Sequence, residues 1–263
     1  MALDNVMGLV DVVEFEVQKY GTRDLLFSVD YATSVGLAVS AERLDIRAGI
    51  GAPIRISTDH TKSANFTSEL PLVDIKALGV KLGKEAVKGA TTAPKSERLA
   101  VATSTVTLKE TPLAGTLKVY VLESNGRDVK NELVVGTPAS NPLHYSIVAK
   151  VITVHATVVA GTLIKVLYDY TTGTAAQLVR VTAKNFAGDV RITGTGYALD
   201  ESGNKAPVSF IVYRAKPTPE FEMMFANGTA TNVPFNATMY PDKVGVEEVY
   251  FDIIPLGDET WVG

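Results

Sequence analysis

The chain has 263 residues, no cysteine and a formal net charge of -4, so disulfides, thiolate metal sites and cysteine nucleophiles are excluded. The negative charge also argues against a protein that binds nucleic acid by neutralising phosphates, since such proteins carry a basic face. Hydrophobic residues make up 46% and charged residues 21%, which is ordinary globular usage and indicates neither disorder nor a long coiled coil.

Alternating apolar and polar residues predict β-strands over the first third of the chain. In 11–19, Val13, Phe15 and Val17 point to one side and the polar residues between them to the other, which is typical of a half-buried strand. Further strands are expected over 24–30, 34–40, 43–48, 53–57 and 63–68.

One amphipathic helix is predicted after these strands. Ser68 is the expected cap, Pro71 suits the first turn, and Gly83 is placed to end the helix. The apolar residues at helical spacing are Leu72, Ile75, Leu78 and Leu82. We expect this stripe to cover one face or edge of a sheet.

The segment 84–98 is small and polar, and its composition predicts a connector that contains a domain boundary. Short strands are then expected over 104–108, 116–122, 147–154 and 162–170. Strands return over 177–183, 189–197, 207–215, 219–226, 232–239 and 247–254. A hairpin turn is expected at 200–204.

These elements predict a mainly β protein with two domains, one of them discontinuous. The outer domain is expected to comprise 1–97 and 173–263, and 98–172 is expected to be an inserted small immunoglobulin-like β module. The insert holds seven Lys or Arg and five Asp or Glu, against 18 and 24 in the rest of the chain. The insert is therefore mildly basic and its flanks are acidic.

No residue pattern indicates a catalytic or metal site, and we expect no enzyme activity and no cofactor. His60, His144 and His155 lie apart, without a second histidine at metal-ligand spacing. Asp59 and His60 follow Ser57 and carry hydrolase residue types, but neighbours along a strand point to opposite faces. A polar edge-strand face explains them better.

Three weaker patterns are each better explained by structure. Asp200, Ser202 and Asn204 alternate oxygen ligands as in a calcium loop but lack an acidic closing residue, so a turn is preferred. Trp261 and nearby aromatics could form a binding platform, although a core or a subunit interface is the commoner role. Three Asn-x-Thr tripeptides, at Asn65, Asn227 and Asn236, are attributed to chance.

Two stretches resemble the family of bacteriophage major tail tube proteins. The first is Arg47-Ala-Gly-Ile-Gly-Ala-Pro-Ile-Arg-Ile-Ser-Thr-Asp-His60, followed by the strand and helix that contain Leu70-Pro-Leu-Val-Asp-Ile-Lys-Ala-Leu-Gly79. The second runs from Val179 to Gly194 and continues through the 200–204 turn to Pro217. The segment between them resembles an extra β domain that some of these proteins carry.

This resemblance implies a β-sandwich or barrel-like subunit, with one flanking helix, that forms hexameric rings stacked into a hollow tube. The tube would conduct DNA into the host without binding it specifically. The implied partners are other copies of the chain and the sheath, tape measure and baseplate proteins, with no membrane. The N-terminus has neither a basic start nor a long apolar stretch, so we expect assembly in the host cytoplasm and a place in the virion tail.

The N-terminal segment 1–11 and the polar stretch 49–66 are expected to make contacts between subunits or rings. The predicted interface residues are Leu3, Val6, Leu9, Arg47, Arg55, Asp59, His60 and Phe66. Two alternatives remain: another virion β protein, such as a tail terminator, baseplate-proximal tube or capsid decoration protein, and an immunoglobulin-like surface or carbohydrate-binding module.

Overall fold

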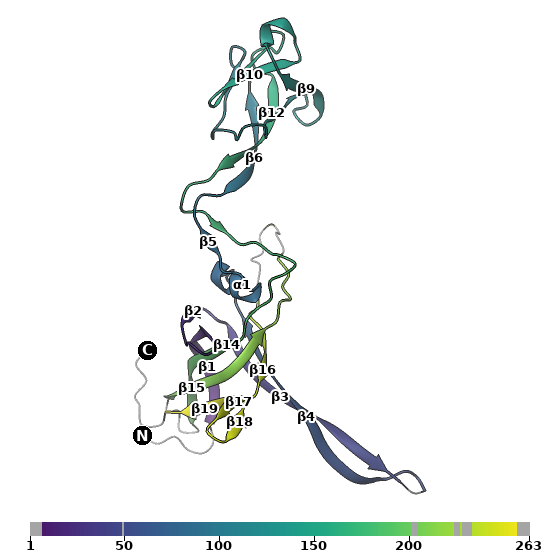
Figure 1. Cartoon of the computed structure of the whole chain (residues 1–263), viewed down its shortest axis with the longest axis vertical. Coiled ribbons are helices and arrows are strands. Elements are labelled where there is room, and N and C mark those ends of the chain that lie inside the picture. Colours follow the sequence, from purple (N-terminus) through teal and green to yellow (C-terminus); the bar gives the residue numbers. More distant parts are fainter. Residues whose placement is uncertain are drawn as a thin grey trace. The chain divides into compact units, whose positions relative to one another are not determined.

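The computed structural model describes residues 7–48, 50–200, 203, 205–223, 227 and 233–256. The protein is mainly β, which confirms the expected fold class. It consists of two compact units, Met1–Ala86 with Val179–Gly263 and the intervening Val87–Leu178, and Figure 1 shows their strands. We call them the larger and the smaller unit.

The larger unit is built around one curled eight-stranded sheet with the order β2-β1-β14-β15-β16-β4-β3, in which β19 also pairs with β15. Its strands are β1 (Met7–Lys19), β2 (Leu25–Val29), β3 (Ser34–Arg47), β4 (Ile54–Glu69), β14 (Val190–Asp200), β15 (Lys205–Pro217), β16 (Ala237–Tyr240) and β19 (Phe251–Pro255). A separate two-stranded sheet joins β17 (Asp242–Val244) and β18 (Glu247–Val249). β14 and β15 pair across the expected hairpin turn.

Several predicted strand boundaries were wrong. The four short strands expected over 34–57 and 63–68 are two long ones, because β3 and β4 pair continuously with bulges that absorb the irregular positions. Only Gln177–Leu178 (β13) is a strand within 177–183. Residues 219–223 are not in a strand, and the remainder of 219–226 lies outside the described residues.

Four aromatic rings form the centre of the larger unit's core, where the inward-facing positions of β1, β2 and β4 meet a loop that precedes β16. Phe66 is fully buried and lies edge-on to Phe15, with ring centroids 5.6 Å apart, and to Phe235 at 6.5 Å. Phe27 packs edge-on against Phe235 at 5.2 Å. Such pairs add to the free energy gained by burying the rings.

The helix α1 (Ile75–Lys81) is shorter than expected and begins at a different cap. Asp74 is the N-cap and accepts a hydrogen bond from the backbone nitrogen of Lys76 at 2.7 Å. Ser68 is instead a buried residue of β4, and its hydroxyl donates to the carbonyl oxygen of Phe235 at 2.7 Å. The prediction failed because Ser68 continues the strand pairing, so the chain cannot turn into a helix until Asp74.

Lys81 at the end of α1 is buried, which is rare for a lysine. Its ammonium donates to the carbonyl oxygens of Glu220 and Pro234, both at 2.8 Å. Burial lowers the pKa of Lys81 below its ordinary value. The side chain thus holds two otherwise irregular segments against the helix.

The smaller unit contains a seven-stranded sheet with the order β6-β12-β8-β9-β10-β11-β7 and a short β13-β5 pair. Its strands are β5 (Val87–Lys88), β6 (Thr92–Ala100), β7 (Thr105–Thr107), β8 (Lys118–Leu122), β9 (Val129–Val135), β10 (His144–Val148), β11 (Val151–Val154), β12 (Leu163–Thr171) and β13 (Gln177–Leu178), with a 3-10 turn η1 (Pro138–Ser140).

Two expectations for this region were wrong. The segment 84–98 contains the boundary between the two units, at Ala86 and Val87, but it is not only a connector, because it also contains most of β6, which pairs with β12 along its whole length. The single strand expected over 147–154 is a hairpin of β10 and β11, in which Val148 pairs with Val151. The edge strand β6 was missed because its segment is rich in Thr, Ala and Gly. The turn between β10 and β11 was missed because it contains neither Gly nor Pro.

Candidate assembly surface

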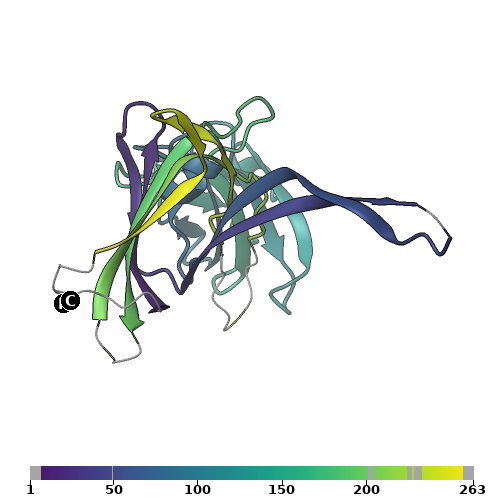
Figure 2. The same ribbon diagram turned by 90° about the horizontal axis from the view of Figure 1, so that it is seen from below.

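The outer half of the β3–β4 hairpin extends beyond the sheet of the larger unit. We call residues 40–63 the hairpin arm; in Figures 1 and 2 it is the long blue ribbon that ends in the 48–53 turn. Ala64, Asn65 and Phe66 of β4 pair with β16, whereas the strand residues of the arm pair only with each other. Isolated two-stranded ribbons are marginally stable in water, so a partner is expected to cover the arm.

One face of the hairpin arm carries polar groups that satisfy each other. Arg43 lies opposite Asp59, with Nε 2.9 Å from Oδ1, and this contact holds the pKa of the Asp59 carboxyl below its ordinary value. Asp45 accepts a hydrogen bond from Ser57 at 2.7 Å and lies 3.8 Å from Arg47. Because these polar groups bind each other, this face does not require another protein to satisfy them.

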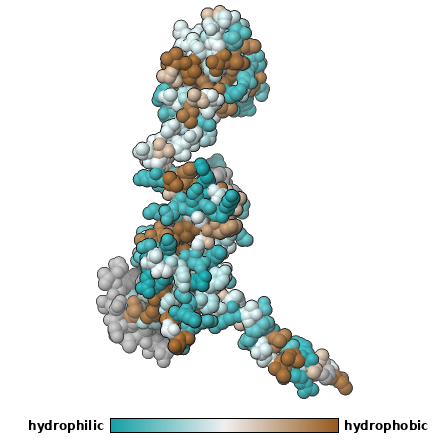
Figure 3. Space-filling model, viewed as in Figure 1, coloured by the Kyte–Doolittle hydropathy of each residue, from teal (hydrophilic) through white to brown (hydrophobic). Residues whose placement is uncertain are grey.

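The other face of the hairpin arm is apolar toward its tip. Ile46 lies directly opposite Ile56, and Leu44 precedes them on the same side of β3. Their exposed fractions are 48%, 59% and 50%. Figure 3 shows a patch of hydrophobic surface toward the far end of the arm. Contiguous exposed apolar side chains of this kind mark surfaces that bind another protein.

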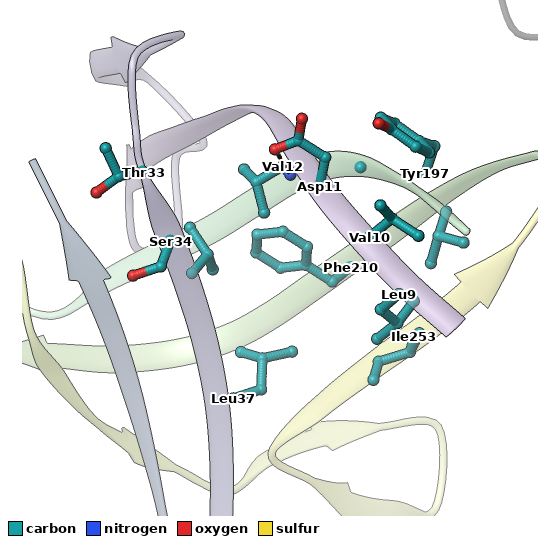
Figure 4. Close-up of a pocket in the computed structure, with 13 residues that line it drawn as sticks. Leu9, Val10, Asp11, Val12, Thr33, Ser34, Leu37, Tyr197, Phe210 and Ile253 are labelled. Carbon is teal, nitrogen blue, oxygen red and sulfur yellow. Dashed lines mark hydrogen bonds between the residues drawn. The ribbon is translucent and has the colours of Figure 1, made fainter. Parts of the chain in front are cut away.

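A second apolar surface, left open by the described residues, is a groove of about 320 Å³ in the same unit. It lies where the curled sheet brings β1 and β3 to either side of Phe210 from β15 (Figure 4). Val12, Leu37 and Ile253 also line the groove. Leu9 lines it as well, and its side chain is 65% exposed. The β1 pairing is irregular here, with a register shift between Leu9 and Asp11. The groove therefore lies at a β-bulge, a common feature of functional edges.

The structure separates the predicted interface residues into three groups. Arg47, Arg55, Asp59 and His60 all lie on the hairpin arm, and Leu9 lines the groove. Phe66 is in the core and cannot touch a neighbour, because alternation along β4 turns it inward. Leu3 and Val6 lie outside the described residues.

Sequence reasoning missed the apolar arm residues Leu44, Ile46 and Ile56. The signal was present as Leu-x-Ile and Ile-x-Ile alternation in two adjacent segments. It predicted strands correctly, but an exposed apolar face and a buried one have the same pattern.

The histidines are separate in the structure as well. His60 lies on the hairpin arm, 3.6 Å from Glu42, and His155 contacts Thr157 at 2.8 Å. Among the described residues, no three His, Asp or Glu side chains are grouped to hold a metal ion. Asp200 begins the predicted turn, but Ser202, Asn204 and Trp261 lie outside the described residues.

Within the described part of the chain, no helix combines the length and hydropathy needed to span a membrane. No curated protein matches the sequence. A model of the YomU/Tube protein family matches residues 7–252, which include the whole smaller unit and most of the larger one. The chain therefore belongs to the YomU/Tube protein family, the structural tube proteins of bacteriophages.

Proposed function

We propose that this chain is a tail tube subunit that polymerises as stacked hexameric rings, forming the hollow conduit through which phage DNA enters the host. The observation that carries the proposal is the hairpin arm, whose apolar face at Leu44, Ile46 and Ile56 is not covered by any described part of the chain. A second copy of the chain is the proposed partner for this face, with its β1–β3 groove as the receptor.

The geometry of such a contact favours a polymer. The arm and the groove are different surfaces of one unit, so contact between copies would be heterologous, and repeated heterologous contacts generate rings or open filaments. Six-fold closure and the passage of DNA are carried over from the resemblance to tail tube proteins. The proposed external partners are the sheath, tape measure and baseplate proteins of the same tail.

The wet face of the sheet, where Glu14, Glu16 and Asp252 lie with Arg191, is the proposed wall of the lumen. Glu16 of β1 lies in one cross-strand row with Thr193, Ile211 and Asp252, and Glu14 lies two residues away on the same face. Phosphates of passing DNA would be repelled by these carboxylates rather than retained. This arrangement suits a conduit that must not bind its cargo.

Electron microscopy of the purified chain across a concentration series tests the proposal. Hollow tubes or six-fold rings are expected above a threshold concentration. The variant Leu44→Ser/Ile46→Ser/Ile56→Ser should stay monomeric, because it removes the apolar arm face while retaining strand pairing. A matched control changes three exposed valines of the smaller unit, Val129, Val148 and Val159, to serine, and should still assemble.

A second variant tests the groove separately. Leu9→Arg places a charge beside the groove without altering the arm, and it should also block assembly. Normal tubes from the triple arm variant would exclude the arm as a contact, and normal tubes from Leu9→Arg would exclude the groove. Wild-type protein that stays monomeric at every concentration would count against self-polymerisation.

A further inference from the structure

The smaller unit presents a cross-strand row of side chains that the proposed tube function does not use. Arg98 of β6 pairs with Lys165 of β12, Lys165 pairs with Tyr120 of β8, and Tyr120 pairs with Glu132 of β9. Residues directly opposite in antiparallel strands project from the same face. We call these four residues the outer row.

The outer row faces away from the core of the smaller unit. Each neighbouring position on the other face is buried: Glu97 beside Arg98, Val166 beside Lys165, Val119 beside Tyr120 and Leu133 beside Glu132. Successive strand residues alternate between faces. Arg98 is accordingly exposed, and Lys165 and Tyr120 are half-buried on the outer surface.

Two cations in the outer row are adjacent and have no counter-charge of their own. Glu132 already forms an ion pair with Lys118, whose Nζ lies 2.8 Å from Oε1 of Glu132. Within the described ranges, neither Arg98 nor Lys165 has an ion pair or a side-chain hydrogen bond. Like charges directly opposite in a sheet destabilise it, and a bound anion would remove that cost.

The charge of the whole smaller unit agrees with an anionic ligand. Residues 87–178 hold nine Lys or Arg and six Asp or Glu, whereas the rest of the chain holds 16 and 23. A protein that binds duplex DNA typically neutralises about six to ten phosphates. Two free cations beside one aromatic ring instead suit a ligand whose single negative charges are each carried on a ring.

We propose that the outer row binds an acidic polysaccharide. The Arg98 guanidinium offers paired N–H donors for a carboxylate, and the Lys165 ammonium adds a second positive charge on the adjacent strand. The Tyr120 ring provides an apolar surface for the neighbouring sugar ring. The contacts are non-covalent, and the row begins at the edge strand β6, beyond which the polymer can continue.

The test uses the full chain and polygalacturonate as the probe, with neutral dextran for comparison, in calorimetric titrations at low ionic strength. Wild-type protein should bind polygalacturonate and not dextran. Arg98→Gln/Lys165→Gln should weaken binding by about tenfold or more. The control Lys88→Gln/Arg127→Gln makes the same change in charge elsewhere in the unit and should bind as the wild type does.

Tyr120→Leu separates ring stacking from general electrostatic attraction. This variant keeps the charges and an apolar side chain, and it should weaken binding several-fold at every salt concentration. Circular dichroism melting should show all variants folded. No binding by the wild type, equal losses in the control and the outer-row variant, or tighter binding of duplex DNA than of polygalacturonate would each overturn the proposal. None of these readouts depends on tube assembly.

Discussion

The two halves of the β3–β4 hairpin have the same strands and the same antiparallel pairing but opposite surroundings. In the inner half, Ala64 and Phe66 of β4 are fully buried and Ser68 is almost so, alternating with exposed residues. In the hairpin arm, exposure is general on both faces. The difference lies in what covers the ribbon. The inner half packs against the core of the unit, whereas the arm is exposed even though the Lys62 carbonyl at its base accepts a hydrogen bond from the Tyr250 hydroxyl at 3.0 Å.

The apolar side of β3 also changes face between the two halves. In the inner half, Val35, Leu37 and Val39 share the face of their partners Ser68, Phe66 and Ala64, which is the core face. Beyond Ser40, Arg43 and Asp45 occupy the positions that continue the core face. The apolar residues Leu44 and Ile46 lie on the opposite face. The arm therefore presents apolar residues on the face that the unit's own core cannot cover, which argues for a partner.

The largest expected difference between the halves comes from removing one large apolar side chain from each. Phe66→Ala should lower the free energy of unfolding by about 3–5 kcal/mol, because it leaves a cavity between Phe15 and Phe235. Ile56→Ala should change it by no more than about 0.5 kcal/mol. Urea unfolding at a concentration below assembly measures both. Similar losses in the two variants would show that the arm packs on its own unit.

Sequence patterns predicted the mainly β fold well because alternation is a local property of strands. They also placed Arg47, Arg55, Asp59 and His60 on what proved to be the arm. They could not separate Phe66 from Ile56, since each is an apolar residue in an alternating strand. The distinction depends on which segments pack over the ribbon, and those, such as 233–236, are remote in sequence.

Lys81 gives the next largest effect, because it secures the segment that covers the inner half. Lys81→Met removes the donor to the Pro234 and Glu220 carbonyls and should cost about 2 kcal/mol, as hydrogen bonds to a charged group do. Lys76→Met, at an exposed position of the same helix, is the control and should be nearly neutral. Equal stabilities in urea would mean that water replaces these bonds without loss.

A matched serine pair tests polar contacts in the two halves. Ser68→Ala leaves the buried Phe235 carbonyl without its hydroxyl donor and should cost about 1 kcal/mol. Ser63→Ala breaks a 2.8 Å hydrogen bond with Ser40 on the exposed arm. Water can replace this bond, so the melting temperature should hardly change. A larger loss from Ser63→Ala would show that the arm's own pairing supports the fold.

The smallest effect is the pH dependence of the hairpin arm. The hydrogen bond and charge of Arg43 hold the pKa of Asp59 below its ordinary value. A carboxyl with a lowered folded-state pKa stabilises the fold above its unfolded-state pKa, and this contribution is lost as pH falls through the lower folded value. Because both groups are exposed, the loss of stability should be small.

Carboxyl-carbon NMR titration of dilute protein measures this effect directly. In Arg43→Gln the Asp59 carboxyl should titrate at a higher pH than in the wild type. Arg55→Gln is the control, because the Arg55 guanidinium donates to the Ala48 carbonyl instead, and it should leave Asp59 unchanged. An Asp59 titration that is the same in all three proteins would mean that the Arg43 pair does not persist in solution. The polar face would then be as free as the apolar one to bind a neighbouring copy.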